Sequence, residues 1–208
     1  MTFVICITWM KFILGKKIGM TQMFDAKGNI TPVTLVEAGP CTVLQKISKD
    51  KEGYDALQLG FVKIEKKSKI KKTMKGKEYR YLREYPITNS QFLKNVGDEV
   101  SVGEFTEGDT VNVSGISKGK GFQGGVKRHG FHGRNATHGA KHESRTIGSI
   151  GQRFPQHVIK GRKMPGRMGF ERITVKNLKM ASIDAQNNVL ALKGAIPGHR
   201  GTLLEIRG

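Results

Sequence analysis

Alternating apolar and polar positions predict several short β-strands in this chain. Ile30 to Glu37 alternates in this way after a run of turn-forming residues, and Cys41 to Ile47 follows a break at Gly39-Pro40. Met180 to Asp184 and Val189 to Leu192 flank four turn residues in the pattern of a β-hairpin.

A second pair of alternating stretches surrounds the turn Glu107-Gly108-Asp109, with Val100 and Val102 before it and Val111 and Val113 after it. Many short strands separated by Gly, Asn and Asp turns favour a small antiparallel β-barrel, so we expect a mainly β protein. The sequence shows no internal repeat and no heptads, and it lacks an apolar run of about 18 residues, so no membrane-spanning helix is expected.

The residues before Met10 are apolar but do not have the features of a signal peptide. No Lys or Arg precedes the apolar run, Lys11 interrupts it, and no small-residue cleavage site follows. We interpret residues 1–9 as an upstream extension or a mis-assigned start, with Met10 as the true first residue. The two cysteines, Cys6 and Cys41, are too few for a disulfide framework, which favours a reducing cytoplasm.

Charge is the compositional feature that changes this picture. The 208 residues include 36 Lys and Arg against 17 Asp and Glu, which gives a net charge of +19. Lys63 to Arg83 holds ten basic and two acidic residues, and Lys118 to Arg167 holds twelve basic residues and one acid. Because the rest of the chain is neutral, we expect a neutral body with two cationic attachments that bind the partner.

The longer attachment has too few apolar residues to fold by itself. It holds 11 Gly and 11 hydrophobic residues in 50 positions, which cannot offset about 1–2 kcal/mol of backbone ordering entropy per residue. We therefore expect its partner, a polyanion, to order it. The shorter attachment allows one short helix. The predicted organisation is a barrel body of residues 10–62, 84–117 and 168–208, a basic insertion at 63–83 and a Gly-rich basic loop extension at 118–167.

Gly119 to Gly124 matches the dinucleotide fingerprint G-x-G-x-x-G and follows a predicted strand. The context of the fingerprint fails, because no amphipathic helix is expected after it and the only suitably spaced acid, Glu143, lies in an unpatterned stretch. We prefer the interpretation that the glycines let the backbone approach phosphates, which neighbouring Lys and Arg side chains neutralise. An RNA-modifying or nucleotide-binding enzyme is the alternative.

Four histidines in the extension, His129, His132, His138 and His142, have spacings that suggest zinc. Structural zinc sites usually include thiolates, and both cysteines are distant in the sequence. We therefore favour hydrogen bonds from these histidines to phosphate or 2′-hydroxyl groups, or stacking on bases. No metal and no cofactor is expected.

Five aromatic residues lie inside the basic segments: Phe122, Phe131, Phe154, Tyr79 and Tyr81. Two roles remain open for them, local packing and stacking on unpaired bases.

A nucleic-acid enzyme would need a nucleophile, a base or clustered carboxylates that hold metal ions. The acids of the cationic segments, Glu65, Glu78 and Glu143, are isolated, and common hydrolase and metalloprotease motifs are absent from the sequence. Lys63 to Lys77 lacks the apolar helical face of a membrane-surface segment. We expect no catalysis, no membrane partner and no small-molecule substrate.

Several of these stretches resemble the bacterial form of the large-subunit ribosomal protein L-three family. Met10 to Phe24 is similar to the family's opening, and Phe105 to Arg128 is similar to its signature, glycines included. The likeness continues through Ala136 to Gly139, Gly148 to Gln152, Lys160 to Gly169 and Lys193 to Gly198, and it spans essentially Met10 to Arg207.

This resemblance implies a translation-protein-like β-barrel on the surface of the large ribosomal subunit, in the cytoplasm. It also implies that the extension enters the rRNA toward the peptidyl transferase centre, with Gly148 to Phe154 near its deepest point. Further implications are direct binding to 23S-type rRNA near its 3′ end, a role in early assembly, and large-subunit proteins fourteen and nineteen as neighbours.

The residues expected to bind RNA are basic, histidine and glutamine side chains of the two attachments. In the extension they are Lys118, Lys120, Lys127, Arg128, His129, Arg134, His138, Lys141, Arg145, Gln152, Arg153, Lys160, Arg162, Lys163 and Arg167. In the insertion they are Lys66, Lys67, Lys69, Lys71 and Lys72, inferred from charge because this region varies within the family.

Bacterial members of the family can carry a methylated glutamine in the extension. Arg153 to His157 departs from the common pattern and is a residue short. The modification is therefore assigned to neither Gln152 nor Gln156.

Overall fold

A computed structural model describes residues 11–25, 28–66, 68, 70–87 and 94–208 of the chain. The expected start at Met10 and the interpretation of residues 1–9 lie outside the described residues. The chain divides into two compact units, one made of the residues up to Ile116 together with Arg172–Gly208, and the other of Ser117–Glu171. The prediction of a mainly β protein is confirmed. Among the described residues, no helix is long and apolar enough to cross a membrane.

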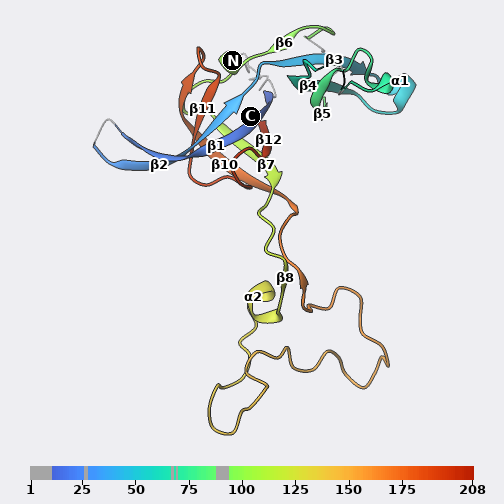
Figure 1. The fold of residues 1–208 in the computed structure, drawn as a ribbon, viewed down its shortest axis with the longest axis vertical. Helices are drawn as coiled ribbons and strands as arrows, with labels where there is room; N and C mark the ends of the chain where they lie inside the picture. Colours follow the sequence, from blue (N-terminus) through green and yellow to red (C-terminus); the bar gives the residue numbers. More distant parts are fainter. Residues whose placement is uncertain (1–10, 26–27, 67, 69, 88–93) are drawn as a thin grey trace, which may run out of the picture. The chain divides into compact units, whose positions relative to one another are not determined.

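Six strands of the first unit pair in a closed barrel, in the order β1-β12-β7-β10-β11-β2 (Figure 1). Their bounds are β1 Phe12–Phe24, β2 Ile30–Ala38, β7 Thr110–Ile116, β10 Arg172–Asp184, β11 Val189–Lys193 and β12 Leu203–Arg207. All neighbouring strands are antiparallel. The strand predicted from Ile30 is β2, and the predicted hairpin is β10 with β11, in which Ile183 pairs with Leu190.

The barrel core follows from the alternation of side chains along its strands. In β7, Val111 and Val113 are fully buried, whereas Thr110 between the turn and Val111 is exposed. Leu204 and Ile206 are buried in the same way in β12. Successive side chains of a strand point to opposite faces, so these residues fill the interior of the barrel.

A second sheet of four strands lies in the same unit, in the order β5-β4-β3-β6 (Figure 1). Its strands are β3 Cys41–Ile47, β4 Ala56–Lys63, β5 Tyr79–Pro86 and β6 Glu99–Val100, and the short helix α1 Lys49–Glu52 follows β3. The predicted strand from Cys41 exists, but it belongs to this sheet and not to the barrel. The chain turns out of the barrel at Gly39, whose φ of +70° is a conformation that glycine adopts without strain.

The predicted strand over Val100 and Val102 is wrong at its second half. β6 ends at Val100, which pairs with Cys41, and Val102 begins the 3-10 helix η3 Val102–Glu104. Both valines are buried. The two valines are therefore apolar because each is buried, one at the end of a strand and the other in the turn that follows, and not because they alternate along one strand.

The four-stranded sheet packs against β1 and β12 of the barrel. The rings of Phe12 and Tyr85 stack with centroids 4.6 Å apart and an interplanar angle of 10°. The Arg207 guanidinium lies 5.6 Å from the Phe12 ring and 5.5 Å from the Tyr85 ring. Barrel and sheet share one hydrophobic cluster, so the first unit has a single core.

Candidate nucleic-acid interface

The second unit begins with a paired stem, which we define as residues 117–123 and 166–171. Ser117 N donates to Glu171 O at 2.9 Å, Lys120 N to Met168 O at 2.9 Å, and Met168 N to Gly121 O at 3.0 Å. The stem includes the short strands β8 Phe122–Gln123 and β9 Gly166–Arg167 (Figure 1). The predicted extension, residues 118–167, starts and ends inside this stem.

Close backbone approach in the stem requires a glycine at position 169. Gly169 has a φ of +74°, and an added Cβ would lie 2.2 Å from the Lys118 carbonyl oxygen. No side chain fits at that distance, because the two backbones themselves are in contact. The glycine therefore lets the outgoing and returning chains pair.

The short helix α2 (Gly125–His129) follows the stem, and it corrects one sequence-based expectation. A helix does begin directly after the Gly119 to Gly124 fingerprint, although it is only five residues long and is capped by Gly130, which has a φ of +73°. Gly125 is buried against Phe131 and Ile147, where an added Cβ would lie 2.8 Å and 2.5 Å from their side chains. This small apolar contact encloses the start of the helix.

Arg128 and His129, two of the residues predicted to bind RNA, contact the same backbone carbonyl. Arg128 Nη1 donates to the Met164 carbonyl at 2.8 Å, and His129 Nε2 lies 3.1 Å from the same oxygen. Both side chains are only half-buried. They tie α2 to the returning chain just before β9.

The remaining candidate residues of the extension have exposed side chains. They are Lys118, Lys120, Lys127, Arg134, His138, Lys141, Arg145, Gln152, Arg153, Lys160, Arg162, Lys163 and Arg167. Arg134 pairs with Glu143, the one acid of the segment, and Arg162 Nη2 donates to the Ser149 carbonyl at 2.8 Å. Every residue from 149 to 163 is exposed, including Gln152 and Gln156. The structure thus gives this stretch no core of its own.

The basic insertion is the connection between β4 and β5. Lys66, Lys71 and Lys72 are exposed, and the expected short helix is only a 3-10 turn, η2 Lys72–Met74. Lys67 and Lys69 lie outside the described residues. The insertion is shorter than predicted, because Lys63 and the residues from Tyr79 onward belong to paired strands.

The aromatic residues divide between packing and exposure. Tyr81 stacks on Phe61 with centroids 6.3 Å apart, and Tyr79 Oη donates to Thr42 Oγ1 at 3.0 Å, so both pack within the four-stranded sheet. Phe122 and Phe154, in contrast, are 76% and 65% exposed. Of the five aromatic residues named above, these two are the most exposed and are therefore the candidates for stacking on bases, although the Arg153 guanidinium lies 6.0 Å from the Phe154 ring.

The described residues hold no group of three or more His, Cys, Asp or Glu side chains placed to bind a metal ion. Cys41 is buried and donates to the Leu14 carbonyl, and burial raises the pKa of its thiol to about 11. A thiol that stays protonated is neither a metal ligand nor a nucleophile at neutral pH. Cys6 lies outside the described residues.

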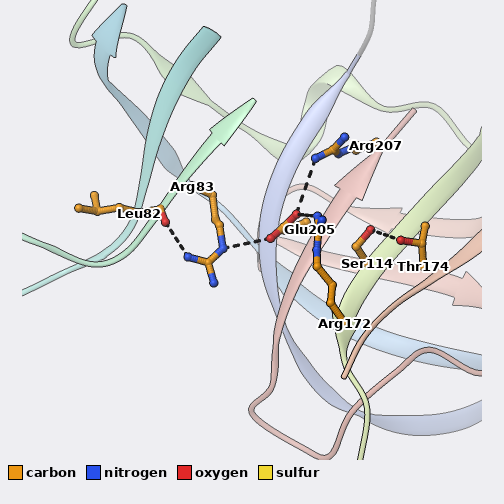
Figure 2. Close-up of polar contacts among 7 residues, drawn as sticks. All are labelled: Leu82, Arg83, Ser114, Arg172, Thr174, Glu205 and Arg207. Atoms are coloured by element: carbon orange, nitrogen blue, oxygen red, sulfur yellow. Dashed lines mark hydrogen bonds and ion pairs between the residues drawn. The ribbon is translucent and has the colours of Figure 1, made fainter. Parts of the chain in front are cut away.

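One cationic cluster was not predicted from the sequence, and it combines Arg83 of the predicted basic insertion with two arginines of the body that was expected to be neutral. Arg83, Arg172 and Arg207 converge on Glu205 from three strands (Figure 2). The three arginines are far apart in the sequence, so no local charge count finds them. Only the strand order of the barrel and the sheet brings them together.

These features define a class of protein that joins a β body to a basic, glycine-rich and largely exposed extension. Such a distribution of charge is typical of proteins that bind nucleic acid through its phosphates. A dehydrogenase or metal-dependent nuclease would instead need a nucleotide loop opening a long helix, or a carboxylate cluster.

Comparison with known proteins identifies the family. The family described as ribosomal protein L3 matches residues 83–189. A large ribosomal subunit protein uL3 of Carboxydothermus hydrogenoformans is 50% identical over 204 residues, which cover 95% of this chain and 96% of the relative. The uL3 proteins of Pelotomaculum thermopropionicum and Desulfitobacterium hafniense are each 46% identical over 95% of this chain and cover 96% and 95% of those relatives.

The chain therefore belongs to the ribosomal protein L3 family, whose members are structural proteins of the large ribosomal subunit and not enzymes. This confirms the resemblance inferred from the sequence. The expected place in the large subunit of the bacterial ribosome, in the cytoplasm, and the role in translation follow from the same membership.

Proposed function

We propose that residues 118–167 carry the contact of this ribosomal protein with large-subunit rRNA. In this proposal the β-barrel is a translation-protein-like body that stays at the subunit surface, and the extension runs into the RNA toward the peptidyl transferase centre. The RNA segment bound lies near the 3′ end of 23S-type rRNA. Large-subunit proteins fourteen and nineteen are the neighbours, and the protein acts early in assembly.

The exposed positive charge of the extension is the main support for this proposal. The extension holds twelve Lys and Arg against a single acid, and nearly all of its cationic side chains are exposed. Bringing so many like charges together on one thin segment is unfavourable unless a polyanion neutralises them. A folded RNA supplies that neutralisation from several sides.

The mechanism is neutralisation of phosphates together with shape. The stem and α2 hold the two chains of the extension side by side, so that Lys118, Lys120 and Lys127 on one chain and Lys163 and Arg167 on the other face outward. Glycines without side chains let the backbone approach RNA closely. The exposed stretch from Gly148 to Phe154 lies near the deepest point of the extension, and the insertion adds Lys66, Lys71 and Lys72.

The experiment measures affinity for large-subunit rRNA at several salt concentrations. If about ten phosphates are contacted, log K falls with log salt at a slope of roughly −7 to −9. Removal of residues 118–167, with the ends joined across the paired Ser117 and Glu171 region, flattens the slope sharply. An unchanged slope after this deletion would place the binding surface elsewhere.

The alternative, a nucleotide-binding or RNA-modifying enzyme using Gly119 to Gly124, is tested with the same preparation. The five-residue α2 offers fewer aligned peptide dipoles than the long helix of a dinucleotide site. We expect neither nucleotide binding nor a covalent change in the RNA.

A further inference from the structure

Glu205 on β12 is a carboxylate shared by three arginines (Figure 2). Arg83 Nε donates to its Oε1 at 3.0 Å, Arg172 Nη2 donates to its Oε2, and Arg207 Nη2 lies 3.8 Å from Oε2. The Glu205 side chain is 12% exposed, whereas those of Arg83 and Arg172 are 49% and 55% exposed. The acid is therefore the covered centre of the cluster, and two guanidinium groups lie at the surface.

The carboxylate does not neutralise this arginine cluster. Three guanidinium groups share one negative charge, so two positive charges remain. A guanidinium has five N–H donors, and one carboxylate accepts only part of the donors that three arginines present. Within the described residues, Nε of Arg207 is buried and has no hydrogen-bond partner. The cluster thus has both spare charge and spare donors.

The arginines are also held in place. Arg207 lies over the stacked rings of Phe12 and Tyr85. Arg83 Nη1 donates to the Leu82 carbonyl at 2.9 Å. Arg172 is the first residue of β10. Ser114 of β7 pairs with Glu205 of β12 on one side and with Thr174 of β10 on the other, so the backbone ladder places Arg172 relative to Glu205. Side chains fixed in this way lose little further entropy when they bind a ligand.

We infer that the arginine cluster of Arg83, Arg172 and Arg207 is a second RNA contact, which binds a backbone phosphate. The planar fork of an arginine matches the oxygens of a phosphate, and Glu205 pre-orients the two exposed forks. The identity of the RNA as rRNA rests on the proposed function. An acidic protein surface would fit the same donors, but the phosphates of an RNA partner are the denser source of negative charge.

The test measures the salt dependence of rRNA affinity for the full chain carrying Arg83→Ala and Arg172→Ala together. Each phosphate contact contributes about 0.7–0.9 to the slope of log K against log salt, so the slope becomes less steep by that amount for each phosphate lost. The matched control is Lys51→Ala, which removes an exposed cation of the same unit on α1. The control retains the slope of the unmodified protein.

A second variant distinguishes the loss of positive charge from a disturbance of the fold. Arg83→Lys with Arg172→Lys keeps both charges but loses the planar forks, so it retains the slope and binds several-fold more weakly. A slope unchanged in the alanine variant, as expected if an acidic protein occupies the cluster, overturns the inference. The inference is also overturned if the lysine variant shows the same reduced slope as the alanine variant. Failure of the proposed function would be seen in a different experiment, in which deletion of residues 118–167 leaves the slope unchanged.

Discussion

Asp109 lies in the turn before β7 and links that turn to the residue before β1. Lys11 Nζ donates to its Oδ2 at 2.7 Å, and the backbone N and the hydroxyl of Thr106 donate to its two oxygens at 2.9 Å and 2.7 Å. These contacts, that of Lys11 first, lower the pKa of Asp109 from 3.8 to about 2. The ionised carboxylate thus joins the first strand, which follows Lys11, to a turn about a hundred residues later.

We predict that Asp109→Asn destabilises the protein by about 1 kcal/mol at neutral pH, a modest value because the ion pair is partly exposed to solvent. The folded pKa lies below the unfolded one, so ionised Asp109 stabilises the fold above pH 3.8 and this stabilisation is lost as the pH falls toward about 2. Denaturant unfolding at a series of pH values checks this. A deficit of the variant that stays constant below pH 3.8 would contradict it.

At the residue scale, alternation predicted which side chains fill the barrel but not which polar groups meet. Val111 and Val113 are buried as their spacing indicates. The pairing of Lys11 with Asp109, and of Arg83 with Glu205, joins residues 98 and 122 positions apart. Such contacts depend on which strands are neighbours in the fold, and the apolar pattern of a single strand does not predict its neighbours.

At the scale of elements, the stem of the extension depends on Gly169. We predict that Gly169→Ala opens the stem, because a Cβ there would lie 2.2 Å from the Lys118 carbonyl oxygen and the left-handed φ adds a cost of about 1–2 kcal/mol. Amide hydrogen exchange at Lys120 and Met168 measures the opening. Gly161→Ala is the control, since Gly161 has a similar φ of +81° but open space around its Cβ position. Equal exchange in both variants would contradict the prediction.

Arg128 and Lys163 have different surroundings in the same unit. We predict that alanine at either position weakens incorporation into the large subunit while the barrel still melts cooperatively, since neither residue belongs to the hydrophobic core of the first unit. Arg128→Ala also loses its bond to the Met164 carbonyl, and hydrogen bonds of charged groups contribute about 1.5–3 kcal/mol. Limited proteolysis of the free protein therefore cuts the Arg128 variant faster at the stem. Loss of cooperative melting in either variant would refute this prediction.

The elements that the sequence predicted are those with a regular apolar alternation. β2, β3 and the β10–β11 hairpin belong to this group. The strands β1 and β5 were not predicted from the sequence. Much of each strand is exposed, and Lys, Arg or Gly residues interrupt the apolar alternation that marks a buried strand. The membership of β3 in a separate sheet was also not predictable, since it depends on pairing with β4 and β6.

At the scale of the whole molecule, charge counting located the extension because its excess is contiguous along the chain. The second unit, Ser117–Glu171, includes the segment that this counting selected. The same counting placed Arg83 at the end of the basic insertion and Arg172 and Arg207 in the neutral body, so it did not find the arginine cluster, whose members come from β5, β10 and β12. Contiguous charge is visible in a sequence, whereas charge assembled by folding is not.

In this proposal the extension becomes ordered by RNA and not by its own packing. The most direct measurement is amide hydrogen exchange of residues 149–163, all of them exposed, in the free protein and in the assembled large subunit, with β7 and β12 as internal references. We expect fast exchange of this stretch in the free protein and strong protection in the subunit, while the barrel strands are protected in both. Equal exchange of residues 149–163 in the two states would contradict it.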